Sequence, residues 1–200
     1  ATSEAARNEQ VSDIEHAVAR MYGRMWAVAI ETNEWLMPAQ GQRLQRLQLS
    51  DVFERYPEEQ YDKAFVLTVE ASGRSFNISC REYDPRIQEL TPLYSQRTLD
   101  PRSIGGVAAC LMRDSFRPML MYVRKFDDEE GRSLMELQAQ AGEISPPDSS
   151  ADQVVEGDVL RPFVRSMERR NPKKLQQLKA LPLSYIRTLS VDREVTRGAI

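Results

Sequence analysis

The chain has 200 residues, of which 41% are hydrophobic and 28% are charged, and its formal net charge is -3. This composition is typical of a globular protein that is long enough to bury a core. The small negative charge excludes a general electrostatic attraction to nucleic acid or to an anionic membrane surface. No run approaches the roughly 18 apolar residues of a membrane span, so we predict no membrane span.

The two ends of the sequence indicate a larger polypeptide. Residue 1 is Ala rather than Met, which indicates removal of a leader or a start inside a longer gene. The residues that follow, TSEAARNEQ, are polar and lack the pattern of a secretory signal. EVTRGAI has the pattern of a strand that has only begun, so we expect the chain to continue beyond Ile200.

The first predicted element is a helix near Ser12. Ser12 and Glu15 have the spacing of a capping box, in which each side chain satisfies a backbone N–H of the first turn. Apolar residues then recur at helical spacing at Ile14, Val18, Met21 and Met25. We therefore expect one side of this helix to pack on the core.

An irregular stretch and a short helix follow. Pro38 and Gly41 interrupt any regular pattern in residues 33–42. The segment LSDVFERY then predicts a second helix with Ser50 or Asp51 at its N-cap.

Residues 63–100 contain the strongest strand pattern. Apolar residues alternate over residues 65–69 and again over 76–80, and Ser72-Gly73 supplies a turn, which predicts a β-hairpin. A third strand is expected in LTPLYSQRTL, where Pro92 favours an edge position in the sheet.

A helix and two strands complete the first predicted domain. Asp100 and Pro101 are typical of a helix start, and Pro118 ends that helix. The segments MLMYVRKF and SLMELQAQA predict two strands joined by the turn DDEEGR. This order predicts an α+β fold with helices on one face of a mainly antiparallel sheet.

The chain is expected to divide at a polar stretch. Residues 142–153 contain two adjacent prolines and no periodic apolar pattern, as is typical of a linker. We predict an α+β domain over residues 1–142, a linker over 143–153 and a small β-rich module over 154–200. Fewer than about 50 residues rarely form an independent domain, so we expect this module to lean on the first domain or to continue past the chain.

The residues of reactive type are few. Cys80 and Cys110 are the only cysteines and indicate buried free thiols, with one disulfide bond as the open alternative. His16 is the only histidine, which excludes a His-based triad or a multi-histidine metal site within this chain. We predict that His16 is solvated or lies at the edge of the core.

Two clusters of like charge are interpreted as solvated turns. Residues 127–130 (DDEE) lack the alternating ligand spacing of a calcium loop, so we predict a hairpin tip. A basic cluster lies around a second turn without the stacking aromatic residues of a nucleic-acid site. The alternative to a solvated turn is that this basic cluster contacts an acidic partner or a lipid headgroup. Its members are Arg169, Arg170, Lys173 and Lys174.

The run REYD at residues 81–84 is the one candidate for acid–base chemistry. Glu82 and Asp84 share one face of a strand, and two carboxylates at that spacing can act as acid and base. No nucleophile or cofactor motif accompanies them, so we favour an ion-pair network with Arg86 or Arg97. The sequence predicts no catalytic, cofactor-binding or metal-binding residue and no cofactor.

Five segments follow one another in an order that resembles a poorly characterised family of large exported bacterial proteins of the cell envelope. They are NEWLMPAQGQRL, VEASGRSFNISCREYDPRIQELTPL, DSFRPML, VVEGDVLRPFVRSMERRN and LKALPLSYIRTL. The resemblance covers residues 30–200 and implies export to the periplasm or cell envelope, with a chain that continues past its present end. It transfers no catalytic residue, and Cys80 and Cys110 depart from the family pattern.

These observations favour a non-enzymatic structural or assembly module of an exported envelope protein. Its expected partners are other envelope proteins or further domains of the same polypeptide, contacted through strand edges and the β-rich module. The alternative is a small-ligand or glycan-binding domain with Trp35, Tyr83 and Tyr94 as aromatic platforms. A hydrolase that uses Glu82 and Asp84 is a third hypothesis.

Overall fold

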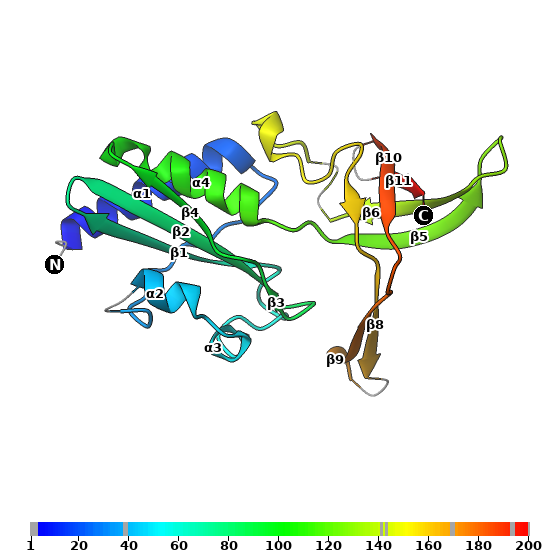
Figure 1. Ribbon diagram of the computed structural model, residues 1–200, viewed down its shortest axis with the longest axis horizontal. Coiled ribbons are helices and arrows are strands. Elements are labelled where there is room, and N and C mark those ends of the chain that lie inside the picture. Colours follow the sequence, from blue (N-terminus) through cyan, green and yellow to red (C-terminus); the bar gives the residue numbers. More distant parts are fainter. Residues whose placement is uncertain are drawn as a thin grey trace. The chain divides into compact units, whose positions relative to one another are not determined.

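The computed structural model describes residues 4–37, 40–140, 142, 144–168, 171–192 and 195–199 (Figure 1). The chain forms two compact units, residues 1–116 and residues 117–200. Antiparallel sheets and a few helices confirm the expected α+β class.

The first unit contains four helices, a short 3-10 turn and four strands among its described residues. They are α1 (Glu4–Tyr22), α2 (Gln40–Gln45), α3 (Leu49–Phe53), β1 (Ala64–Ser72), β2 (Ser75–Asp84), β3 (Glu89–Leu90), β4 (Tyr94–Thr98), η1 (Pro101–Ser103) and α4 (Ile104–Ser115).

Strands β1 and β2 form the hairpin that the alternating pattern predicted. Ser72 pairs with Ser75, so the loop is only Gly73 and Arg74. Gly73 has a φ of 61°, a left-handed conformation that glycine adopts without steric cost. On its other edge β2 pairs with β3 and β4. Pro92 lies between these two, so the predicted third strand forms at the edge of the sheet but is interrupted.

Helices α1 and α4 lie on one face of this sheet (Figure 1). The Trp26 ring, just after α1, stacks on Tyr22 with 3.7 Å between centroids and on Phe65 of β1 with 5.3 Å. Cys80 Sγ of β2 lies 3.6 Å from Ser115 Oγ of α4. These contacts bind both helices to the central hairpin.

Helices α2 and α3 lie on the opposite face (Figure 1), so helices cover both faces rather than the one face expected. Helix α2 begins inside the stretch of residues 33–42 that was predicted to be irregular. The pattern did not reveal it, because a six-residue helix is too short to show a clear period. The buried residues of this face are Leu36, Leu44, Leu47, Val52, Ala64, Val66 and Tyr83.

Two helix starts differ from their predictions. Helix α1 begins at Glu4, so Ser12 lies inside it, because the preceding residues EAARNEQ are mostly good helix formers. The N-cap of α3 is Gln48 rather than Ser50 or Asp51. Its backbone N–H donates to the Asp51 carboxylate at 2.8 Å, so Asp51 supports the first turn from the third helical position.

The helix start predicted at Asp100 and Pro101 is that of the 3-10 turn η1, which leads directly into α4. The Asp100 carboxylate caps η1 by accepting the backbone N–H of Arg102 at 3.0 Å. At its second residue, Gly105, α4 passes very close to α1. A Cβ built on Gly105 would lie 2.5 Å from the Asp13 carbonyl oxygen, whereas a Cβ on Gly106 would meet nothing within 4 Å. The absence of a side chain at Gly105 therefore permits the contact between these helices.

The second unit consists mainly of strands. Five of them form a sheet in the order β5-β6-β11-β10-β7, and β8 and β9 form a separate two-stranded ribbon. The elements are β5 (Leu120–Asp127), β6 (Ser133–Ala139), η2 (Ser149–Ala151), β7 (Val159–Leu160), β8 (Phe163–Glu168), β9 (Asn171–Ala180), β10 (Ile186–Asp192) and β11 (Val195–Ala199).

The division between the units differs from the predicted boundary at residues 143–153. Strand β6 pairs with β11, from Gln138 opposite Val195 to Leu134 opposite Ala199. The β5–β6 hairpin, expected in the first domain, therefore belongs to the sheet of the second unit. The predicted linker contains no strand among its described residues, and Ala151 within it is buried.

Candidate functional site

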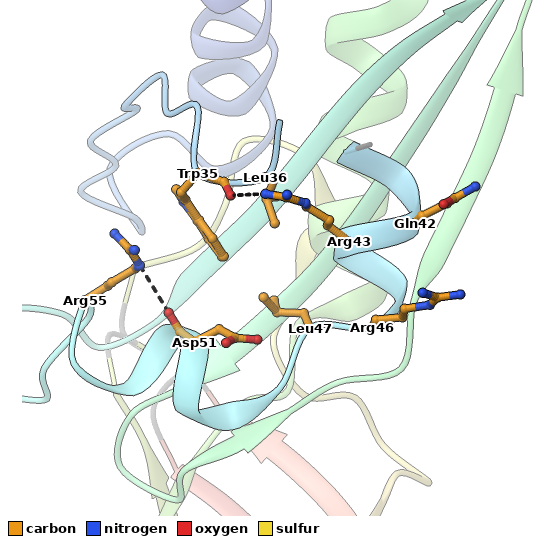
Figure 2. A pocket seen from close by; sticks show the side chains of 8 residues that line it. All are labelled: Trp35, Leu36, Gln42, Arg43, Arg46, Leu47, Asp51 and Arg55. Atoms are coloured by element: carbon orange, nitrogen blue, oxygen red, sulfur yellow. Dashed lines mark hydrogen bonds between the residues drawn. The ribbon is translucent and has the colours of Figure 1, made fainter. Parts of the chain in front are cut away.

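A cleft lies beside α2 and α3 in the first unit (Figure 2). Its volume is about 530 Å³, which is within the range of small-molecule sites. Arginines outnumber acidic residues three to one in its lining, so the cleft has an excess of positive charge. The lining residues are Trp35, Leu36, Gln42, Arg43, Arg46, Leu47, Asp51 and Arg55.

The floor of this cleft is part of the core of the first unit. Leu47 is buried in the cluster that includes β1 and β2, and Trp35 packs against the same cluster. Helix α2 is held near both ends. The Glu70 carboxylate accepts the Gly41 N–H at 2.9 Å, and the Arg81 guanidinium donates to the Leu47 carbonyl oxygen at 3.0 Å. The cleft therefore has a fixed position on the sheet.

Two arginines lie on opposite sides of Trp35 (Figure 2). Arg43 donates from Nη1 to the Trp35 carbonyl oxygen at 3.0 Å. Arg55 donates from Nε to the Asp51 carbonyl oxygen at 3.2 Å, and its guanidinium lies 5.0 Å from the Trp35 ring centroid, within cation–π range. A guanidinium has five N–H donors, so these bonds leave donors for a ligand.

The third arginine, Arg46, follows α2 directly and is exposed. Its side chain makes no hydrogen bond or ion pair with any residue that the structure describes, whereas its backbone N–H continues the helical pattern to Gln42. Of the three arginines in the cleft, Arg46 is thus the one whose guanidinium has no partner among the described residues.

The REYD carboxylates meet a different cation from those predicted. Lys63 Nζ donates to Glu82 Oε1 at 2.6 Å and to Asp84 Oδ2 at 2.5 Å. The two carboxylate side chains are only 1% and 3% exposed, and that of Lys63 is 14% exposed. Phe116 completes the cluster, with its ring centroid 5.4 Å from Nζ. Lys63, which sequence reasoning missed, immediately precedes β1 and lies opposite the end of β2.

The expected pairing with Arg86 or Arg97 is replaced by this cluster. Arg86 contributes its backbone N–H to Asp84 Oδ1 at 2.8 Å, while its guanidinium pairs with Asp62. Arg97 pairs in register with Asn77, five positions from Glu82 and thus about 17 Å away along the strand. The two carboxylates do belong to an ion-pair cluster, but its cation is Lys63, which precedes the other strand of the hairpin.

This burial bears on the hydrolase hypothesis. A catalytic carboxylate must contact its substrate, and Glu82 and Asp84 instead contact Lys63 inside the fold. The geometry favours a structural role for the pair. It stabilises the end of β2 by giving two buried carboxylates a common counter-ion.

The three aromatic residues predicted as platforms are not brought together. Tyr83 is fully buried in the core beneath α2 and α3, and burial raises the pKa of its hydroxyl. Tyr94 is half-buried on the edge strand β4. Only Trp35 lines the cleft, where one arginine already lies over its ring.

The remaining candidates lie apart from the cleft. Cys80 and Cys110 are free thiols as predicted; Cys80 is buried and Cys110 is half-buried. His16 is exposed on α1. The basic cluster of residues 169, 170, 173 and 174 lies outside the residues whose side chains the structure describes. Within the described ranges, no three His, Cys, Asp or Glu side chains are grouped to hold a metal ion.

The acidic run forms the hairpin tip that was predicted. Asp128 accepts hydrogen bonds from the Arg132 Nε at 2.7 Å and from the backbone N–H groups of Glu130 and Arg132. The hydrogen bond from the Arg132 side chain holds the pKa of the Asp128 carboxyl below its usual value. The tip is thus closed by its own basic residue.

Among the described residues, the second unit exposes more large hydrophobic side chains than the first. Of the large hydrophobic side chains that are exposed in the described chain, six belong to the first unit and twelve to the second. Three of the twelve are consecutive on β5, where Met121, Tyr122 and Val123 are 65%, 56% and 47% exposed. Strand β5 lies at one end of the sheet and pairs only with β6 among the described strands.

Neither a protein-family model nor a curated protein sequence matches this chain. None of the helices in the described ranges is long and apolar enough to cross a membrane.

Proposed function

We propose that this chain is a non-enzymatic assembly module that acts through protein–protein contacts of its second unit. The observation that carries the proposal is the exposed apolar segment Met121–Val123 on the edge strand β5. Together with the resemblance of the sequence to exported envelope proteins, it favours partners in the cell envelope or in further domains of the same polypeptide.

An edge strand offers a row of backbone N–H and C=O groups to another strand. Proteins usually protect such an edge with charges, prolines or a covering element. On β5 the charged residues Arg124 and Lys125 come only after the apolar segment, and Arg124 Nη2 is already paired with Glu136 on β6 at 2.8 Å. An extended segment of a partner protein fits this edge, since added strands gain backbone hydrogen bonds and side-chain contacts together.

The test compares substitutions at the two edges of the same sheet. The variant Met121→Lys with Val123→Lys places charges on the β5 edge, whereas Val159→Lys places one on β7, at the other end of the strand order, where Val159 is 65% exposed. Each tagged protein is used to recover companions from the envelope fraction of the native source, with mass spectrometry and amide hydrogen exchange as readouts.

We expect the wild-type chain and Val159→Lys to recover the same companion, and its binding to protect the amides of β5. The β5 variant is expected to lose that companion while keeping its circular dichroism spectrum. Equal recovery by all three proteins, or no companion with the wild-type chain, would contradict the proposal.

A further inference from the structure

We propose that the arginine-lined cleft of the first unit binds a small organic anion, in which a carboxylate or phosphate group is attached to an apolar body. This site is independent of the strand edge described above, because every residue that lines it belongs to residues 35–55.

The excess of positive charge in the cleft favours binding of an anion. Three arginines line the cleft, and the single carboxylate among the lining residues, that of Asp51, already accepts the Gln48 N–H at 2.8 Å. A guanidinium donates two parallel hydrogen bonds to a carboxylate or a phosphate, which no neutral group matches in strength. Arg46 has no side-chain partner among the described residues, so a ligand would supply the first acceptor for it.

The apolar residues of the cleft favour a ligand that carries an apolar group next to its anionic group. Trp35, Leu36 and Leu47 give the cleft an apolar side that is continuous with the core. A volume of about 530 Å³ suits a small molecule rather than a long polymer. An inorganic ion would leave this apolar surface in contact with water, so we expect organic anions to bind more tightly than inorganic ones.

The cleft is also built before any ligand arrives. Arg43 and Arg55 are held by the carbonyl oxygens of Trp35 and Asp51, at 3.0 Å and 3.2 Å, on opposite sides of the indole (Figure 2). Groups that are already in place lose little conformational entropy on binding, which raises affinity.

The experiment uses the full chain, labelled with nitrogen-15, and follows backbone and indole N–H signals by nuclear magnetic resonance. The probes are benzoate, phenyl phosphate, the neutral isostere benzamide and inorganic phosphate. The test variant is Arg46→Gln, and its matched control is Arg97→Gln, which removes an exposed arginine from β4 outside the cleft.

We expect benzoate or phenyl phosphate to shift the signals of residues 35–55, with an affinity that falls as salt is added. Arg46→Gln should weaken this binding about tenfold, as the loss of a charge-assisted hydrogen bond implies, and Arg97→Gln should leave it unchanged. The tighter of the two anions identifies the preferred acidic group.

Three outcomes would overturn the inference. In the first, benzamide shifts the same signals as strongly as benzoate, which would show that charge is irrelevant. In the second, inorganic phosphate binds as tightly as phenyl phosphate, which would show a surface anion patch only. In the third, Arg46→Gln binds like the wild-type chain, or no probe shifts the signals of the cleft.

Discussion

Lys63 neutralises two carboxylates that the strand β2 buries side by side. Without a cation, Glu82 and Asp84 would be two like charges on one face of a strand, almost out of contact with water. A buried pair of this kind contributes little against an apolar alternative, but removing one partner leaves an uncompensated charge. Lys63, just before β1, thus supplies the positive charge that allows the end of β2 to be buried.

We expect Lys63→Met to lower the free energy of unfolding by about 3–5 kcal/mol, because it leaves buried carboxylates without their cation. Adding Glu82→Gln and Asp84→Asn to that variant should recover part of the loss. The exposed Lys179→Met serves as the control and should change stability by less than about 0.5 kcal/mol. Urea unfolding followed by circular dichroism measures all three, and a wild-type midpoint for Lys63→Met would contradict the structural role.

Cys80 makes stability depend on alkaline pH. Burial raises the pKa of its thiol from 9.0 to about 12, while the hydrogen bond with Ser115 acts in the opposite direction. The folded state therefore keeps this proton where the unfolded state loses it. The contribution of the buried thiol to the free energy of unfolding is fully present below pH 9. It is lost as pH rises from 9 towards 12, and the free energy of unfolding then falls by up to about 1.4 kcal/mol per pH unit.

Cys80→Ala has no thiol at this position, so its folding is linked to up to one proton fewer between pH 9 and pH 11. We therefore expect its free energy of unfolding to fall less steeply over this range than that of the wild-type chain. Tyr22, whose pKa burial also raises, is present in both proteins and contributes to the pH dependence of each. Urea unfolding at several pH values provides the measurement, with Cys110→Ala as the control. Parallel pH profiles for wild type and Cys80→Ala would exclude this origin of the pH dependence.

At the scale of elements, the close passage of α4 over α1 depends on one position. The backbone carbonyl of Asp13 would lie 2.5 Å from a Cβ at Gly105, and a backbone atom cannot move aside as a flexible side chain can. Gly106 occupies the next position of the same helix and has open space around it. The two glycines thus form a natural pair for separating packing from helix propensity.

We expect Gly105→Ala to destabilise the chain by about 1–3 kcal/mol through overpacking. Gly106→Ala should instead stabilise it by about 0.5–1 kcal/mol, because alanine loses less backbone entropy in a helix. Thermal unfolding should therefore move in opposite directions for the two variants. Stabilisation by both would mean that the helices do not pass as closely as described.

At the scale of the whole molecule, the first sheet was predictable and the second was not. The hairpin of β1 and β2 follows from local alternation and a two-residue turn. The pairing of β6 with β11 joins segments about 60 residues apart, which no local pattern specifies, so the boundary was expected too late in the chain. Lys63 was missed for a related reason: its register against Glu82 and Asp84 is set by the hairpin.

The candidate cleft was only partly readable from the sequence. The segment QRLQRLQL places two arginines and two leucines three residues apart, but this run is too short to specify a helix by itself. Arg55 and Trp35, however, reach the cleft only through the packing of α2 and α3 on the sheet. The sequence predicted Trp35 as an aromatic platform for a ligand, but it did not predict the arginines that surround it.

The position of the division can be tested with fragments. Residues 1–116 keep every strand pairing of the first sheet, so we expect this fragment to fold cooperatively with dispersed amide signals. Residues 1–142 add the β5–β6 hairpin without β11, and an isolated hairpin is marginally stable in water. We expect weak, exchange-broadened signals for the added residues. Sharp, protected signals across β5 and β6 in the longer fragment would support a boundary near residue 143 instead.

The pairing of β6 with β11 also sets an order of events during synthesis. The sheet of the first unit is complete once β4 has emerged from the ribosome, whereas β6 must wait for β11 about 60 residues later. In that interval one edge of β6 has no partner strand from this chain, and such edges are prone to aggregation. A pause in translation before β11 would therefore lengthen the period in which the unpaired edge of β6 can aggregate.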